Sequence, residues 1–280
     1  MSTAHEAVRA STEPGRHLLD ICAPSWGDDP YADALRAGRG PLFLRRTDGW
    51  LLPLDVERWC ARADATDLDV VERCEGAVLD IGCGPGRLVA ALAARGRHAL
   101  GIDVSRAAVA HTARLGGQAL HRSVFEPLPG EGRWGTALLL DGNIGIGGDP
   151  SALLGRTEEL LAPGGLLIAE TASVDIDERV DVRLVPAAEV HGLHEGTYEG
   201  AYENMHERPF PWARLGTPAL VRRAGRAGWR ITGQWTADGR SFVALRSRST
   251  RSSPEPANST AVISSHRARK PSPDTPVAEA

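Results

Sequence analysis

The segment from Ala77 to Glu170 alternates short apolar runs with amphipathic runs, and this alternation constrains the fold more than any other feature of the chain. Apolar runs such as AVLDI at 77–81 have the length of buried strands. The runs between them have a helical period, and several end at a glycine. Strands that alternate with helices predict βαβ units, and hence a parallel sheet with helices on both faces.

The segments on the N-terminal side have a different character. Residues 1–24 are polar and mixed, so we expect them to be poorly ordered. Residues 25–76 predict a small N-terminal cap with a hairpin that turns at Asp48-Gly49. Two short helices follow, and Thr66 with Asp69 is predicted to form a capping pair.

The C-terminal half extends the same domain, which we expect to cover residues 77–246. After a long irregular stretch at 175–218, a helix and a hairpin at 229–246 complete it, with Asp238-Gly239 in the turn. Residues 247–280 are rich in serine, proline and threonine, which predicts a disordered tail.

Composition excludes several classes of partner. The chain of 280 residues carries a net charge of −4, and Lys270 is its single lysine, so nothing global attracts nucleic acid or an anionic membrane. No apolar stretch is long enough to cross a bilayer, and the N-terminus lacks the apolar core of a signal peptide. The four cysteines have no paired spacing, which favours a reduced, cytoplasmic setting without a zinc site.

The turn LDIGCGPGR at 79–87 suggests nucleotide chemistry. Its glycines follow the pattern GxGxG, whereas the dinucleotide fingerprint is GxGxxG and would place its third glycine at Arg87. Asp80 stands just before the glycines, and Asp103 ends the next strand, roughly 20 residues on, at the spacing of an acid that binds ribose hydroxyls. A nicotinamide oxidoreductase is disfavoured by the glycine spacing but stays an alternative.

These residues resemble the class I S-adenosylmethionine-dependent methyltransferases, and in particular the bacterial small-molecule type. The resemblance covers Ala77 to Glu170, and the terminal hairpin agrees with it. It implies a doubly wound, seven-stranded mixed sheet, mostly parallel with an antiparallel last strand, an N-terminal cap and a lid insertion. It also implies S-adenosyl-L-methionine as cofactor, with the glycine turn under the methionine part, Asp80 at its amino end and Asp103 on the ribose.

The resemblance extends to further cofactor contacts. Where the family often has an acid that meets the adenine amino group, this chain has Ser123, whose hydroxyl can accept the same bond. The N–H of Val124 is the expected partner of the adenine ring nitrogen. The implied cofactor-binding residues are Asp80, Gly82, Cys83, Gly84, Gly86, Asp103, Val104, Ser123, Val124, Asp141 and Gly142.

A second glycine-rich turn, DGNIGIGG at 141–148, follows the fourth strand and is expected to face the first turn across one cleft. We expect Asp141 and Asn143 to lie where methyl donor and acceptor meet. The later glycines are interpreted as a flexible turn into a helix capped by Asp149 or Ser151. The turn lacks the two prolines and the aromatic residue typical of amino-directed nucleic-acid methyltransferases, which favours a small-molecule acceptor.

The irregular stretch at 175–218 is interpreted as a lid over that acceptor. It contains His191, His194 and His206, and a histidine of ordinary pKa can act as a general base. We predict His191 or His194 for this role, with Glu170 as a further candidate, and no metal. The acceptor atom (oxygen, nitrogen or carbon) and the oligomeric state stay open, and a non-catalytic module that binds the cofactor as a sensor or scaffold is the alternative function.

Overall fold

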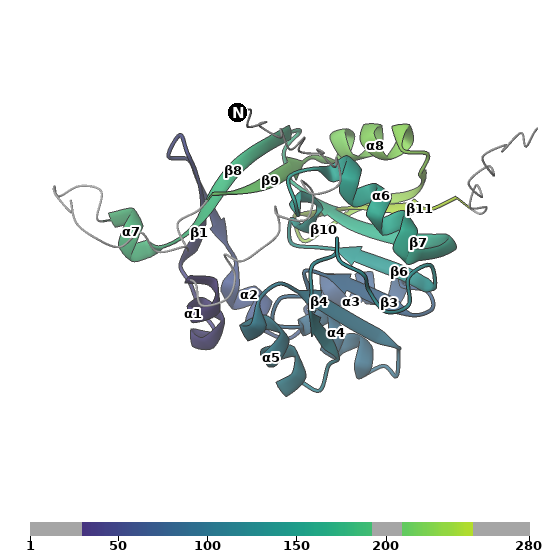
Figure 1. Ribbon diagram of the computed structural model, residues 1–280, viewed down its shortest axis with the longest axis horizontal. Helices are drawn as coiled ribbons and strands as arrows, with labels where there is room; N and C mark the ends of the chain where they lie inside the picture. Colours follow the sequence, from purple (N-terminus) through teal and green to yellow (C-terminus); the bar gives the residue numbers. More distant parts are fainter. Residues whose placement is uncertain (1–29, 192–208, 249–280) are drawn as a thin grey trace, which may run out of the picture. The chain divides into compact units, whose positions relative to one another are not determined.

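The computed structural model describes residues 30–191 and 209–248, and its largest element is a seven-stranded sheet (Figure 1). The strand order is β10-β11-β7-β6-β3-β4-β5. Neighbouring pairs among β3 to β7 are parallel, and β11 runs antiparallel to β7, so the predicted doubly wound, mixed sheet with an antiparallel last strand is confirmed. The strands are β3 (Val78–Ile81), β4 (Ala99–Asp103), β5 (Ala119–His121), β6 (Trp134–Leu139), β7 (Leu161–Thr171), β10 (Arg230–Ala237) and β11 (Arg240–Arg246).

Helices cover both faces of this sheet because its strands alternate buried side chains between two cores. Leu79 of β3 belongs to a core that includes side chains of α6 and α8, whereas Val78 belongs to one that includes side chains of α3 and α4. Figure 1 shows these two pairs of helices on opposite sides of the sheet. The helical segments are α1 (Pro30–Ala37), α2 (Val56–Cys60), α3 (Ala65–Arg73), α4 (Arg87–Ala93), α5 (Arg106–Arg114), the 3₁₀ turn η1 (Asn143–Gly145), α6 (Pro150–Leu160), α7 (Ala187–His191) and α8 (Thr217–Arg226).

A second sheet of four strands joins the N-terminal cap to the insertion. Its order is β2-β1-β8-β9, and all its neighbouring strands are antiparallel. Leu42 and Leu44 of β1 pack with Val182 and Leu184 of β8 and with Tyr31 of α1 in one buried cluster. Two segments that lie far apart in the sequence therefore share one sheet and one core. The strands are β1 (Leu42–Arg46), β2 (Leu51–Leu54), β8 (Asp177–Pro186) and β9 (Phe210–Leu215).

This second sheet corrects the interpretation of 175–218 as an irregular stretch. Residues 177–186 and 210–215 are strands. Val182 and Leu184 of β8 are buried against the cap, whereas Ala213 and Leu215 of β9 are buried in the core of the seven-stranded sheet. The predicted hairpins at Asp48-Gly49 and at Asp238-Gly239 are confirmed by the antiparallel pairs β1–β2 and β10–β11.

The predicted capping pair of Thr66 and Asp69 is wrong. Helix α3 begins earlier, at a capping box in which Asp64 accepts from the N–H of Asp67 at 2.8 Å and Asp67 accepts from the N–H of Asp64 at 3.3 Å. Two acids three residues apart satisfy these end groups as well as the predicted pair would, and Thr66 is instead buried within the first turn of the helix.

No helix in residues 30–191 or 209–248 combines the length and the apolar character needed to cross a membrane.

Candidate cofactor site

The glycine turn that follows β3 requires glycine at its first and last positions. Gly82 and Gly86 have φ values of +70° and +89°, a region that disfavours other residues. A Cβ on Gly82 would lie 2.7 Å from Nδ2 of Asn143, and one on Gly86 would lie 2.3 Å from Oγ1 of Thr112. The turn is therefore packed tightly against the second glycine turn on one side and against α5 on the other.

Asp103 lies against this turn as the sequence predicts. It ends β4, the strand that pairs in parallel with β3, and its Oδ2 accepts from the N–H of Gly84 at 2.9 Å. Its Oδ1 accepts from the N–H of Ser105 at 2.8 Å. The two backbone N–H groups orient this carboxylate beside the glycine turn.

Asp80 is the second carboxylate of the turn, and its environment is unusual. Its side chain is buried, and within the described part of the chain its Oδ2 has no hydrogen-bond partner. Burial raises the pKa of Asp80 to about 7; Arg87 opposes this rise, while the charges of Asp141 and Asp103 add to it. A buried acceptor without a donor costs free energy, so this site suits a cationic group that arrives with a ligand.

Asp141 follows β6 and lies at the centre of a buried ion network. It adopts a left-handed backbone conformation with φ of 57°, which is costly for a residue other than glycine. Its N–H donates to Oε2 of Glu170 at 2.8 Å. Arg58 Nη2 donates to Oδ1 at 2.6 Å and Arg87 Nη1 donates to Oδ2 at 2.7 Å. These contacts hold the pKa of Asp141 below its ordinary value against the effect of burial.

The network closes into a ring beneath the turn. Arg87 Nε donates to Oδ2 of Asp67 at 2.8 Å, and Arg240 Nη1 donates to the other oxygen of Asp67 at 2.8 Å. Arg240 Nη2 also donates to Oε2 of Glu170 at 2.8 Å. Burial would raise the pKa of Asp67, but the hydrogen bonds and charges of Arg87 and Arg240 outweigh it and lower this pKa to about 2. The ring thus ties α3, α4, β7 and β11 to Asp141.

Sequence reasoning missed Arg58, Asp67, Arg87 and Arg240. An arginine at the start of a helix and an aspartate in a first turn have the same pattern as residues on a solvated surface. Their burial follows from the packing of elements distant in the chain, and no local signal in the sequence distinguishes them.

Two predicted acceptor-side residues have structural partners. Asn143 donates from Nδ2 to the carbonyls of Ile81 and Gly82 at 3.0 and 2.9 Å, so it ties the second glycine turn to the first. Glu170 accepts from Arg240 at both carboxylate oxygens, at 2.9 and 2.8 Å. These bonds, and the N–H of Asp141 that donates to Oε2, hold Glu170 in the ion network.

The later glycines of the second turn are not a flexible turn, which corrects our interpretation. A Cβ on Gly145 would lie 2.2 Å from the carbonyl of Ala213, and one on Gly148 would lie 2.6 Å from Cβ of Pro211. Strand β9 packs directly on this turn, and Ile146 bridges to Trp212. Asp149 caps α6 as predicted.

The other implied cofactor contacts lie around the same edge of the sheet. Ser123 is buried, and its Oγ accepts from the N–H of Phe125 at 3.3 Å. Val124 is buried too, and the carbonyl of Val104 accepts from His121 at 2.8 Å. The thiol of Cys83 is buried, which raises its pKa well above the ordinary value and makes it a packing group.

Of the three histidines of the insertion, only His191 lies within the described residues. The backbone of His191 ends α7, while His194 and His206 lie outside the described residues. Among residues 30–191 and 209–248, no group of three or more histidine, cysteine, aspartate or glutamate side chains could hold a metal ion.

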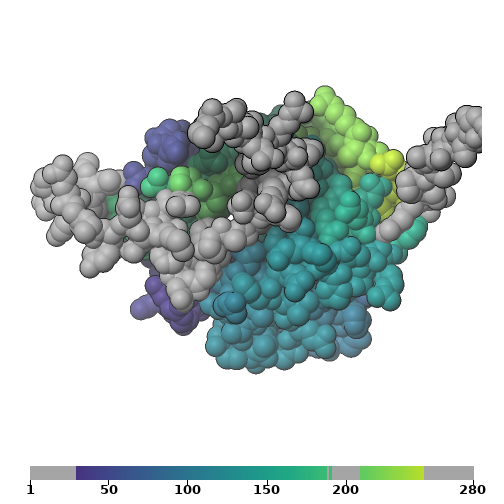
Figure 2. Space-filling view, viewed as in Figure 1, coloured from purple at the N-terminus to yellow at the C-terminus, as the bar shows by residue number. Residues whose placement is uncertain are grey.

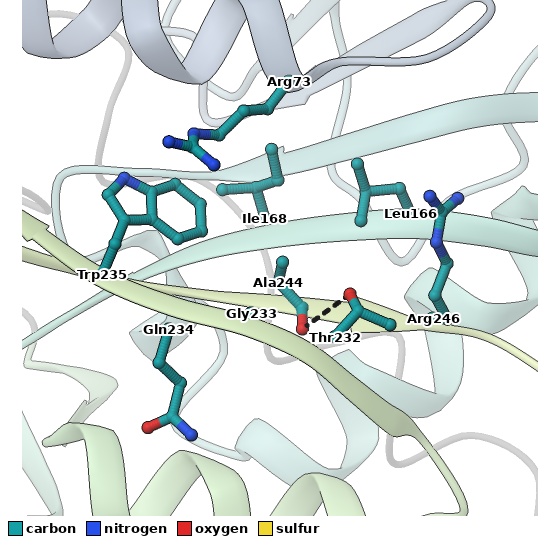
Figure 3. Close-up of a pocket in the computed structure, with 9 residues that line it drawn as sticks. All are labelled: Arg73, Leu166, Ile168, Thr232, Gly233, Gln234, Trp235, Ala244 and Arg246. Carbon is teal, nitrogen blue, oxygen red and sulfur yellow. Dashed lines mark hydrogen bonds between the residues drawn. The ribbon is translucent and has the colours of Figure 1, made fainter.

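A cavity of about 290 Å³ lies elsewhere, between α3 and strands β7, β10 and β11 (Figure 3). Its floor includes Leu166 and Ile168, and the guanidinium of Arg73 lies over the ring of Trp235 with 4.4 Å to the ring centroid. Gln234 points away from the other labelled side chains (Figure 3). None of the predicted site residues lines this cavity. In Figure 2, the blue and teal part of the chain that carries α4 to α6 forms a continuous packed surface.

Comparisons with known proteins agree with this arrangement. A family model described as "Methyltransferase domain" matches residues 56–204, more than half of the chain. The fold is similar to that of a SAM-dependent methyltransferase from Bacteroides fragilis, solved with S-adenosyl-L-homocysteine, with a TM-score of 0.60 and 18% identity over 78% of this chain and 92% of that one.

Weaker likenesses are also found. The CcbJ methyltransferase from Streptomyces caelestis has a TM-score of 0.49 and 16% identity, and covers 80% of this chain and 98% of its own. The Burkholderia thailandensis 1,6-didemethyltoxoflavin-N1-methyltransferase has a TM-score of 0.47 and 17% identity, over 66% and 77%. A comparison with curated proteins gave no match. The family match over more than half of its length shows that this chain belongs to the methyltransferase domain family.

Proposed function

We propose that the chain transfers a methyl group from S-adenosyl-L-methionine to a small-molecule acceptor. The observation that carries the proposal is the pair of carboxylates at one edge of the sheet, Asp103 oriented by Gly84 and Asp80 buried beside it with an unpartnered oxygen. A ribose and an amino group, both of which this cofactor carries, complement that pair. The family match supports the reaction class.

The chain's own residues would bind and orient the cofactor. Asp103 would accept from the ribose hydroxyls, and Asp80 from the amino group of the methionine part. Ser123 and the N–H of Val124 would meet the adenine. The bound cofactor supplies a methyl group on a positively charged sulfur, which an aligned nucleophile can attack in line.

The protein's contribution to rate would then be alignment and exclusion of water. Holding two reactants in line is worth about 7–11 kcal/mol at most. The ion network supports alignment because it fixes Asp141, and with it the second glycine turn. The cap and the insertion form the second sheet, and its strand β9 packs on that same turn. This packing supports a role of the insertion as a cover over the acceptor.

A small acceptor is favoured by the net charge of −4, which gives no attraction for nucleic acid. We also propose that the protein is cytoplasmic and of bacterial origin. The setting is supported by the free thiols of Cys60, Cys74 and Cys83.

Calorimetry with S-adenosylhomocysteine and with NADH tests the proposal. We expect the first to bind and the second to give no heat. Binding of NADH with no binding of S-adenosylhomocysteine would overturn the proposed function.

A general base is proposed for acceptors that must lose a proton, with His191 or His194 as the residue. Once an acceptor that the protein methylates is known, replacing the true base by alanine should lower the turnover rate about 10²–10⁴-fold. Its cofactor affinity should be unchanged, and its rate should lose the dependence on pH near 6 to 7 that an ordinary histidine gives. Glu170→Ala serves as the comparison. If all three variants keep wild-type profiles, alignment alone suffices.

A further inference from the structure

Arg58 carries a second unsatisfied polar group at the site. This arginine lies on α2 in the cap; its Nε donates to Asp55 Oδ2 at 3.0 Å and its Nη2 to Asp141 Oδ1 at 2.6 Å. Its Nη1 is buried and has no hydrogen-bond partner within the described part of the chain. A buried guanidinium donor without an acceptor is costly, so this group suits an anion that a ligand brings.

The unsatisfied donor of Arg58 and the unsatisfied acceptor of Asp80 belong to the same region. Asp80 is at the carboxyl end of β3, and Asp141, which Arg58 contacts, follows β6, the neighbouring parallel strand. The charge of Asp141 is also among those that act on Asp80. The buried Nη1 of Arg58 and the buried Oδ2 of Asp80 are thus both linked to Asp141, one by contact and one by charge. A positive donor and a negative acceptor of this kind complement a zwitterion, the α-amino acid group.

The other two arginines of the network have acceptors for their donors. Arg87 donates to Asp67 and Asp141, and Arg240 donates to Asp67 and Glu170. Among the three arginines, Arg58 therefore has the donor left for an added carboxylate.

We propose that Arg58 binds the carboxylate of the cofactor's methionine part opposite Asp80, so that cofactor binding and docking of the cap are coupled. The inference rests on the proposed function. It makes the cap part of the cofactor site, although the cap lies before the glycine turn in the sequence.

The surroundings of α2 fit this coupling. Trp59, the next residue, packs edge-on against Tyr31 with 6.2 Å between the ring centroids. The hydroxyl of Tyr31 lies 3.3 Å from where a Cβ on Gly84 would be. The cap thus lies over the glycine turn on one side and contacts Asp141 on the other, so a ligand held between them would stabilise the docked cap by mass action.

The test compares two ligands that differ in the amino acid group. S-adenosylhomocysteine carries it, and 5′-methylthioadenosine lacks it. For Arg58→Met, calorimetry should show S-adenosylhomocysteine binding about 10- to 150-fold more weakly, the range for a lost charged hydrogen bond. The affinity for 5′-methylthioadenosine should change less than about twofold, within the scatter of a surface change. Arg62→Met, an exposed arginine four positions on, is the matched control.

The outcomes separate the inference from the function. If wild type binds neither ligand, the proposed function fails. If wild type binds S-adenosylhomocysteine and Arg58→Met loses nothing, or loses both ligands equally, the inference is overturned. If Arg58→Met does not fold, the inference is tested on the wild-type protein. The carboxamide of S-adenosylhomocysteine should bind to it at least about tenfold more weakly than the acid. Equal affinities of the two compounds would overturn the inference.

Discussion

At the scale of single residues, the site is organised by where buried charges find partners. Asp103 is buried and Asp141 is half-buried at the carboxyl edge of the sheet, yet Asp103 is held by backbone N–H groups and Asp141 by arginines. Charge-assisted bonds from two guanidinium groups engage both oxygens of Asp141. We therefore propose a binding role for Asp103 and a positioning role for Asp141.

Asp103→Ala should weaken S-adenosylhomocysteine binding, because two charge-assisted hydrogen bonds to the ribose are lost. Each contributes about 1.5–3 kcal/mol, so we expect a loss of at least about tenfold in calorimetry. Asp69→Ala, which removes an exposed partner of Arg73 far from the turn, is the control and should bind as wild type. Unchanged affinity for Asp103→Ala would remove this residue from the site.

Asp80 should make the ligand-free protein less stable as pH rises. Its pKa is about 7 in the folded chain and near 3.8 in the unfolded chain, so the folded state holds the proton more strongly between these values. The cost of burying the carboxylate is absent below the lower value and complete above pH 7. The thermal midpoint of Asp80→Asn relative to wild type should therefore rise between pH 5 and pH 8. A constant difference would contradict the raised pKa.

At the scale of elements, the ion ring joins segments that lie far apart in the sequence. Arg87 begins α4, Asp67 lies in the first turn of α3 and Arg240 begins β11. Arg87 and Asp67 are buried, and Arg240 is half-buried. The second sheet does the same for the cap and the insertion, since β1 pairs with β8 over five residues. Connections of this kind hold the turn after β6 through contacts of Asp141 with α2, α4 and β7.

Arg87→Met should destabilise the fold strongly, because it leaves Asp67 and Asp141 buried with less compensation. Removing one partner of a buried pair costs about 3–5 kcal/mol, which urea unfolding at pH 7 would measure. Arg95→Met, whose exposed guanidinium donates to the carbonyl of Ala91, is the matched control.

The pH dependence of that loss gives a second readout. The depressed pKa of Asp67 means that its contribution is present above about 3.8 and is lost as pH falls toward 2. The difference between Arg87→Met and wild type should accordingly shrink on acidification. A difference that persists at pH 2 would assign the effect to lost packing.

At the scale of the whole molecule, the seven-stranded sheet ends at Arg246, and the chain continues for two more described residues. The N–H of Ser247 donates to the carbonyl of Gly165 at 3.0 Å, and Arg248 contacts Glu158. These bonds make the edge at 247–248 part of the folded unit.

Truncation after Arg248 should leave the thermal midpoint and cofactor affinity unchanged, because residues 249–280 are poor in apolar side chains to bury. Truncation after Leu245 is the contrast: it removes the pairing of Arg246 with Glu75 and the Ser247 bond, and should lower the midpoint. A lower midpoint for the first truncation would show that the tail docks.

The sequence by itself determined the α/β sheet, the glycine turn and Asp103, because these rest on local patterns: hydrophobic period, positive φ at glycine and acids at strand ends. Tertiary structure alone decided the rest. The strands of the insertion exist because the cap offers β1 as a partner, and strand pairing is non-local. Arg58, Arg87 and Asp141 are joined across 83 and 54 positions of sequence. Burial of charge depends on what folds over it, which no short pattern encodes.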